Sequence, residues 1–112
     1  MEWLTLAKVV ASAAAWRTFG SKSAGRVLIN ALSSPNENVR IIAGMLLVKG
    51  GRRALPLLRE ALKGRSALVT VITIVGDIGD KSVVGEIEPF LDDRDPQVQK
   101  AARAVCELLT AN

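Results

Sequence analysis

The stretch GGRRALPLLREAL, from Gly50 to Leu62, is similar to GSKSAGRVLINAL, which runs from Gly20 to Leu32, 30 residues earlier. Both stretches begin with glycine and end with Ala-Leu, and their apolar residues coincide. A third copy follows, because Ile87 lies 29 residues after Leu58. A short repeat of this kind predicts a chain built from stacked copies of one supersecondary unit.

A second kind of segment lies between these copies. Residues 36–48 carry apolar side chains at the spacing of one buried helix face, and residues 96–109 repeat the pattern two periods later. The middle counterpart, residues 66–79, is rich in β-branched residues, but its place in the repeat favours a helix over a strand. We therefore expect seven antiparallel helices near residues 2–18, 22–32, 36–49, 52–63, 66–76, 81–91 and 96–110.

Turn residues support this division. Ser34-Pro35-Asn36-Glu37 is interpreted as a capping box with proline at the first helical position, and Asp95-Pro96 as a similar start. Pro89 lies near the end of its helix and predicts a bend there.

NENVRIIAGMLLVKGGRRALPLLREALKG, residues 36–64, resembles a HEAT repeat of the short kind found in phycobilin-lyase-like proteins. The similarity lies in Val39-Arg40 at the start of the second helix and in the glycines before the next pair. Residues 91–109 resemble the same motif, with Gln99 where the family has arginine, whereas the middle copy departs further. The resemblance implies an all-α, right-handed α-solenoid of HEAT-like repeats with a period of 29–30 residues, forming a single domain over residues 1–112. A fold of this kind does not by itself determine the function, which has to be inferred from a site.

The residue types argue against catalysis. The chain has 112 residues and no histidine, so it lacks the commonest general base and neutral metal ligand. The single Cys106 excludes an internal disulfide and a cysteine-rich zinc site. Asp77, Asp80 and the acids of residues 92–95 are interpreted as turn and capping residues, since the rest of a calcium loop is missing. We therefore expect that the protein is not an enzyme and that it binds no cofactor and no metal ion. We also expect no membrane-spanning segment and a cytoplasmic location.

The net charge of +4 is unevenly distributed along the chain. Residues 1–65 hold eleven Lys or Arg and three acids, a balance of +8, and residues 66–112 hold four Lys or Arg and eight acids, a balance of −4. A basic half predicts either nucleic-acid or phosphate binding or a solvated edge that favours solubility. It also allows head-to-tail pairing of two copies through opposite charges.

The N-terminal helix, residues 2–18, is apolar most of the way round. One interpretation is a homo-oligomer interface or a docking surface for a partner helix, with Trp3, Leu6, Val10 and Trp16 as its anchors. The alternative is that the helix packs over the end of its own core.

Taken together, these patterns predict a non-enzymatic protein–protein interaction module, a scaffold or adaptor with an unidentified protein partner. Nucleic-acid or phosphate binding and self-assembly are the alternatives. The predicted concave-face residues are Arg40, Gly44, Thr73, Gln99 and Arg103, and the predicted basic-edge residues are Lys49, Arg52 and Arg53.

Overall fold

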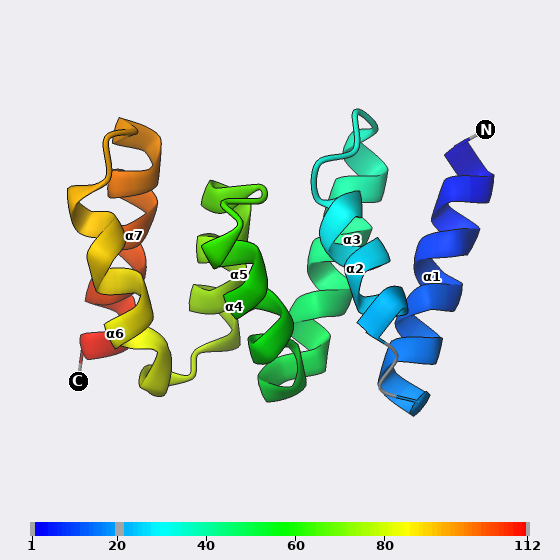
Figure 1. Cartoon of the computed structure of the whole chain (residues 1–112), viewed down its shortest axis with the longest axis horizontal. Coiled ribbons are helices and arrows are strands. Elements are labelled where there is room, and N and C mark those ends of the chain that lie inside the picture. Colours follow the sequence, from blue (N-terminus) through cyan, green and yellow to red (C-terminus); the bar gives the residue numbers. More distant parts are fainter. Residues whose placement is uncertain (1, 20–21, 112) are drawn as a thin grey trace.

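The computed structural model describes residues 2–19 and 22–111, with side chains for residues 4–16 and 22–111. Every regular element in these ranges is helical, which confirms the expected all-α class (Figure 1). The elements are α1 (Glu2–Phe19), α2 (Lys22–Ala31), α3 (Glu37–Gly50), η1 (Gly51–Ala54), α4 (Leu55–Lys63), α5 (Leu68–Ile78), η2 (Lys81–Val83), α6 (Val84–Ile87), η3 (Glu88–Asp92) and α7 (Pro96–Thr110).

The helices follow one another along the longest dimension of a body that measures 38 × 27 × 23 Å. Figure 1 shows α1 at one end, then the pairs α2/α3 and α4/α5, and finally α6/α7 at the other end. α1, α3, α5 and α7 contact each other in succession, and α2 contacts α4. Helices of the same kind therefore lie side by side, so that a position in one helix has a counterpart in its neighbour.

The β-branched segment of the middle copy is a helix, α5, as its place in the repeat predicts. The helix expected over residues 81–91, in contrast, is divided into η2, the single-turn α6 and η3. Pro89 explains the second division, because it has no N–H for the carbonyl of Gly85 and its ring crowds that carbonyl. The chain after Ile87 therefore continues as a tighter 3₁₀-helix.

The helix starts differ in part from the sequence expectation. The Asn36 side chain is the N-cap of α3 and accepts a hydrogen bond from the Val39 N–H at 3.1 Å. The predicted capping box is wrong, because α3 begins at Glu37, which leaves Ser34 outside the helix and Glu37 too early to reach back. The predicted start at Asp95 is confirmed, since its carboxylate accepts from the Gln97 N–H at 2.9 Å.

The core is a continuous aliphatic layer, and no polar side chain of the described residues is buried in it. Burying each large aliphatic side chain stabilises the fold by about 1.5–3 kcal/mol relative to leaving it exposed. The largest fully buried side chains include Leu28, Leu47, Leu58, Ile72 and Ile87, which come from five different helices. Packing between helices, rather than any single helix, therefore holds the fold together.

Candidate ligand groove

An open groove of about 840 Å³ lies between α3 and α5. We call it the ligand groove. Its lining residues are Leu32, Arg40, Ile41, Gly44, Met45, Val48, Lys49, Val69, Thr70, Thr73, Ile74 and Asp77.

The walls of the ligand groove are unusually apolar for a surface. Met45 is 65% exposed, Ile41 51% and Val69 38%. These are three of the six exposed large hydrophobic side chains among the described residues. Apolar side chains gathered on one surface mark a site for a ligand or a partner. Burying them against an apolar ligand would remove their contact with water.

Gly44 lines the ligand groove, and its lack of a side chain leaves space there. A Cβ atom at this position would meet only Ile74 Cδ1 at 3.8 Å and Leu32 Cδ2 at 4.0 Å, which are ordinary contact distances. α3 therefore has room at Gly44 that a side chain could occupy. Because glycine stands there, the buried side chains of Leu32 and Ile74 reach the groove and form part of its lining.

Charged groups stand on both walls. The Arg40 guanidinium Nη1 donates to the Ser34 carbonyl at 2.7 Å, which fixes that side chain at the start of α3. Lys49 comes nine residues later, so the two backbone positions are about 14 Å apart along the helix axis. Neither Lys49 nor Asp77 forms an ion pair with another residue in the described part of the chain. The groove therefore offers separated cations, one free carboxylate and an apolar surface between them.

The structure brings four predicted partner-binding residues together here, namely Arg40, Gly44, Lys49 and Thr73. The Thr73 hydroxyl donates to the Val69 carbonyl of its own helix at 2.9 Å. The sequence analysis did not point to Ile41, Met45 or Val69, and it interpreted Asp77 as a turn residue, whereas Asp77 lies in the last turn of α5 and lines the groove. For the apolar ones the available signal was their position outside the buried stripe of their helices.

The other predicted partner-binding residues lie outside the ligand groove. The Gln99 amide donates to the Asp93 carbonyl oxygen near the start of α7, and Arg103 is exposed on that helix. Arg52 Nε is 3.1 Å from an Asp80 carboxylate oxygen, and Arg53 is exposed beside it. The predicted set thus occupies several surfaces rather than one, and its role in partner binding stays a prediction.

Three ion pairs join the basic half of the chain to the acidic half. Their partners are 28, 27 and 28 residues apart, close to one period of the repeat. The pairs are Arg52 with Asp80, Arg59 with Glu86 and Arg65 with Asp93. The uneven charge is therefore partly neutralised within the molecule, which leaves fewer cations of the basic half to contact nucleic-acid phosphates.

Two of the acidic partners, Asp80 and Asp93, have pKa values below their ordinary range. Hydrogen bonds from Ser82 lower the pKa of Asp80, with a further contribution from Arg52. The Arg65 side chain lowers the pKa of Asp93, and the Asp95 N–H adds to that effect. Burial raises the pKa of the half-buried Cys106 thiol, and Glu88 adds to the shift, so the thiolate is disfavoured at neutral pH.

The residues predicted for self-association separate into two faces of α1. Leu6 and Trp16 are half-buried against the core, and the Trp16 ring lies where a Cβ atom on Gly50 would come within 2.6 Å of it. Val10 is 53% exposed on the other face. The side chain of Trp3 lies outside the described residues. Trp16 and Leu6 therefore pack on their own chain, and self-association through α1 stays a prediction.

In the described ranges, no three His, Cys, Asp or Glu side chains are grouped so that they could share a metal ion. None of the described helices combines the length and the apolar character that crossing a membrane requires.

Comparison with known proteins finds one relevant similarity. The phycocyanobilin lyase subunit alpha of a Picosynechococcus species is 34% identical over 105 residues. The match covers 80% of this chain but only 39% of the length of that relative. No protein-family model matches the sequence, and no solved structure matches it. This partial, distant similarity supports a relationship to the family that the repeats resemble.

The expectation that the chain is not an enzyme is contradicted by this relative, which is named as a subunit of a lyase. That expectation was based on the missing histidine and the single cysteine, the usual carriers of acid–base and nucleophilic catalysis. Those criteria test for a complete set of reacting groups in one short chain. They do not test whether a chain holds the substrate within a larger enzyme.

Proposed function

We propose that this chain is a helical-repeat component of a bilin lyase and that its ligand groove holds an open-chain tetrapyrrole. The proposal includes a right-handed α-solenoid of HEAT-like repeats over residues 1–112. The succession of contacts from α1 through α3 and α5 to α7 supports that arrangement. The ion pairs spaced by 27–28 residues support it as well, because each joins neighbouring copies of the repeat.

The single observation that carries the proposed ligand is the chemistry of the groove. A linear tetrapyrrole has a long apolar ring system, anionic propionate groups and pyrrole N–H donors. Ile41, Met45 and Val69 provide exposed apolar surface for the rings. Arg40 and Lys49 are cations suited to propionates, and the Asp77 carboxylate is an acceptor suited to pyrrole N–H groups. The volume of about 840 Å³ lies in the range of small-molecule sites.

The name of the relative, a subunit, also supports a protein partner. The chain spans 39% of the length of that relative, so the lyase reaction as a whole belongs to a larger assembly in this proposal. The part assigned to this chain is to bind and orient the bilin. A rigid helical surface loses little conformational entropy when it binds, which suits this role.

The test is a titration of the purified chain with phycocyanobilin, followed by the change in visible absorption of the pigment. Met45→Asp places a carboxylate on the apolar wall, and we expect it to weaken binding by about tenfold or more. Leu108→Asp is the matched control, because Leu108 is 61% exposed and Met45 65%, and Leu108 lies on α7 outside the groove. Lys49→Met should weaken binding at low salt more than at high salt, since it removes a charge.

The expected pattern is saturable binding by the wild type, a strong loss in Met45→Asp and no more than a small change in Leu108→Asp. Two results would contradict the proposal. One is a wild-type chain that does not change the pigment spectrum, and the other is an equal loss in both aspartate variants. Circular dichroism of each variant checks that the helices are intact.

A further inference from the structure

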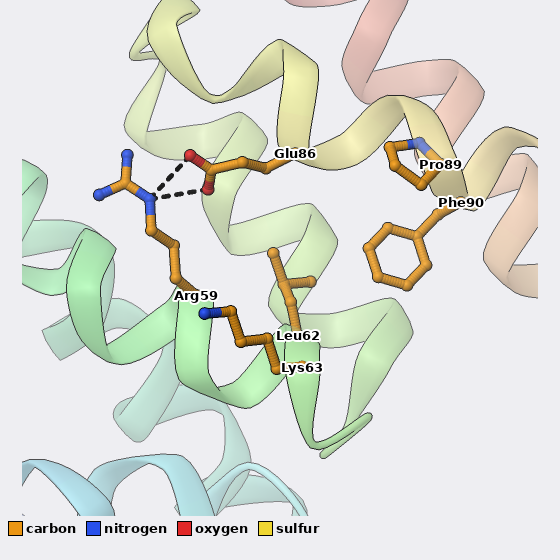
Figure 2. A pocket seen from close by; sticks show the side chains of 6 residues that line it. All are labelled: Arg59, Leu62, Lys63, Glu86, Pro89 and Phe90. Atoms are coloured by element: carbon orange, nitrogen blue, oxygen red, sulfur yellow. Dashed lines mark hydrogen bonds and ion pairs between the residues drawn. The ribbon is translucent and has the colours of Figure 1, made fainter.

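A second recess, which shares no residue with the ligand groove, lies between α4 and the α6–η3 segment. We call it the α4/η3 recess. It measures about 460 Å³ and is shown in Figure 2. Its lining residues are Arg59, Leu62, Lys63, Glu86, Pro89 and Phe90.

The inner surface of the α4/η3 recess is apolar. Leu62 is 6% exposed and belongs to the core, and Phe90 is half-buried and packs against the same core. Figure 2 shows the Phe90 ring facing Leu62 across the recess, with Pro89 beside the ring. One aromatic and two aliphatic side chains thus form a surface against which a flat apolar group can pack.

The polar groups of the recess carry a net positive charge. Arg59 Nε donates to both carboxylate oxygens of Glu86, at 2.9 and 2.7 Å, so these two charges neutralise each other. Lys63 forms no ion pair with any described residue, and Figure 2 shows its amine beside the Arg59 side chain, with Leu62 between the amine and the Phe90 ring in this view. Among the described residues, Lys63 is therefore the cation of this recess that has no ion-pair partner, beside the Arg59–Glu86 pair and the apolar side chains.

The equivalent position one repeat period earlier holds a smaller recess, which is lined by different residue types. A recess of about 290 Å³ lies between α2 and α4. Its α4 wall contains Leu57, Glu60 and Ala61, each 29 residues before the α6–η3 residues of the larger recess. Ala61 stands where Phe90 stands, and Glu60 where Pro89 stands. An apolar recess with a surplus cation is thus a property of this one copy and not a general result of helix stacking.

We propose that the α4/η3 recess binds a small aromatic carboxylate, with its ring between Leu62 and Phe90 and its carboxylate at the Lys63 ammonium. The volume lies in the range of small-molecule sites. A carboxylate bound to an ammonium is a charge-assisted contact, and the exposed Lys63 is accessible to a ligand from solution. The α4/η3 recess shares no residue with the ligand groove, so this proposal does not depend on the proposed binding of a bilin.

The experiment uses 2-naphthoate as the carboxylate and 2-naphthalenemethanol as its uncharged counterpart. Each is titrated into the purified chain, and binding is followed by the fluorescence anisotropy of the naphthalene ring. Lys63→Met keeps most of the side-chain length and removes the charge. Lys22→Met is the matched control, because Lys22 is an exposed lysine on α2 outside both sites. Phe90→Leu tests the aromatic wall.

We expect 2-naphthoate to bind the wild type more tightly than the alcohol. Lys63→Met should weaken naphthoate binding by about tenfold and leave the alcohol unchanged, since a contact to a charged group is worth about that much. Phe90→Leu should weaken both ligands, and Lys22→Met neither. The proposal is overturned if millimolar naphthoate does not bind the wild type. It is also overturned if Lys63→Met and Lys22→Met reduce binding equally, which would indicate only general attraction to a basic surface.

Discussion

α3 and α5 occupy equivalent places in the repeat, yet they are stabilised differently. α3 begins with the capping side chain of Asn36. α5 has no capping side chain and follows Ala67, which has the left-handed φ of 45°. α5 instead has six buried residues, whereas α3 has three. The comparison shows that core packing compensates for the missing N-terminal cap of α5, whose C-terminus keeps a left-handed glycine cap at Gly79.

The largest effect is expected from the core of α5. Ile72 is fully buried at the place where α3 has Ala43, 29 residues earlier. Ile72→Ala should lower the free energy of unfolding by about 2–5 kcal/mol, because it leaves a cavity between helices. Ile72→Val should cost only about 0.5–1.5 kcal/mol. Urea unfolding monitored by circular dichroism measures both, and equal losses would mean that the site relaxes around the missing atoms.

The second-largest effect is expected from replacing two glycines by alanine, one in α5 and one in α3. A Cβ atom on Gly76 of α5 would come within 2.8 Å of Val105 Cγ2, and valine cannot easily rotate away. Gly76→Ala should therefore destabilise the fold by about 1–2 kcal/mol, the overpacking cost less the gain in helix propensity. Gly44→Ala in α3 should instead stabilise it by up to about 1 kcal/mol, since its nearest contact is at 3.8 Å. Thermal unfolding should move the two midpoints in opposite directions, and a shift in the same direction would contradict this account.

A smaller effect on stability is expected from substitutions at the N-cap residues of α3 and α5. Asn36→Ala removes the side chain that accepts from the Val39 N–H and should cost about 1 kcal/mol. Ala67→Gly removes the strain of a left-handed alanine, but it also makes the unfolded chain more flexible. The net gain from Ala67→Gly should be no more than about 0.5 kcal/mol. If both substitutions destabilise the protein equally, the conformation of Ala67 is not a source of strain.

The same contrast explains what the sequence could predict. The helix class and most helix bounds follow from apolar spacing. The repeat also predicts a helix near residues 66–76 despite the β-branched residues, and α5 (Leu68–Ile78) lies slightly later in the chain. The division of residues 81–91 was foreseen only as a bend at Pro89, because the extent of 3₁₀ geometry depends on packing around it. The exact N-cap of α3 depended on whether the chain turned at Ser34 or Asn36, which composition does not determine.

The candidate site was only partly predictable. Arg40, Gly44 and Thr73 are predicted for one shared face of the second kind of helix, whereas Lys49 is predicted for the basic edge and lies in the same groove. The pairing of Arg52 with Asp80 depended on how neighbouring copies are positioned, so that arginine was expected at a free edge. Met45 lies one position after Gly44 and outside the buried stripe of α3, and the packing of α3 against α5 shows that it is exposed beside the groove.

The smallest expected effect concerns the ion pairs at the two ends of α5. Arg65 precedes α5 and pairs with Asp93, and Asp80 follows α5 and pairs with Arg52. Both carboxyl pKa values are lowered in the folded protein, so both groups add stability above their ordinary pKa. That contribution is lost as the pH falls below about 4 and through the lowered folded values.

Asp93→Asn removes one of these charges and gives the matched test. At pH 6 the variant should be slightly less stable than the wild type, because exposed ion pairs contribute little. Between pH 6 and pH 3 the wild type should lose more stability than the variant, so that the two urea midpoints converge. Hydrogen exchange should then show that acid weakens protection at the ends of α5 before it affects α3, whose Asn36 cap does not titrate. Parallel pH profiles for wild type and variant would mean that Asp93 contributes as a turn residue and not through its charge.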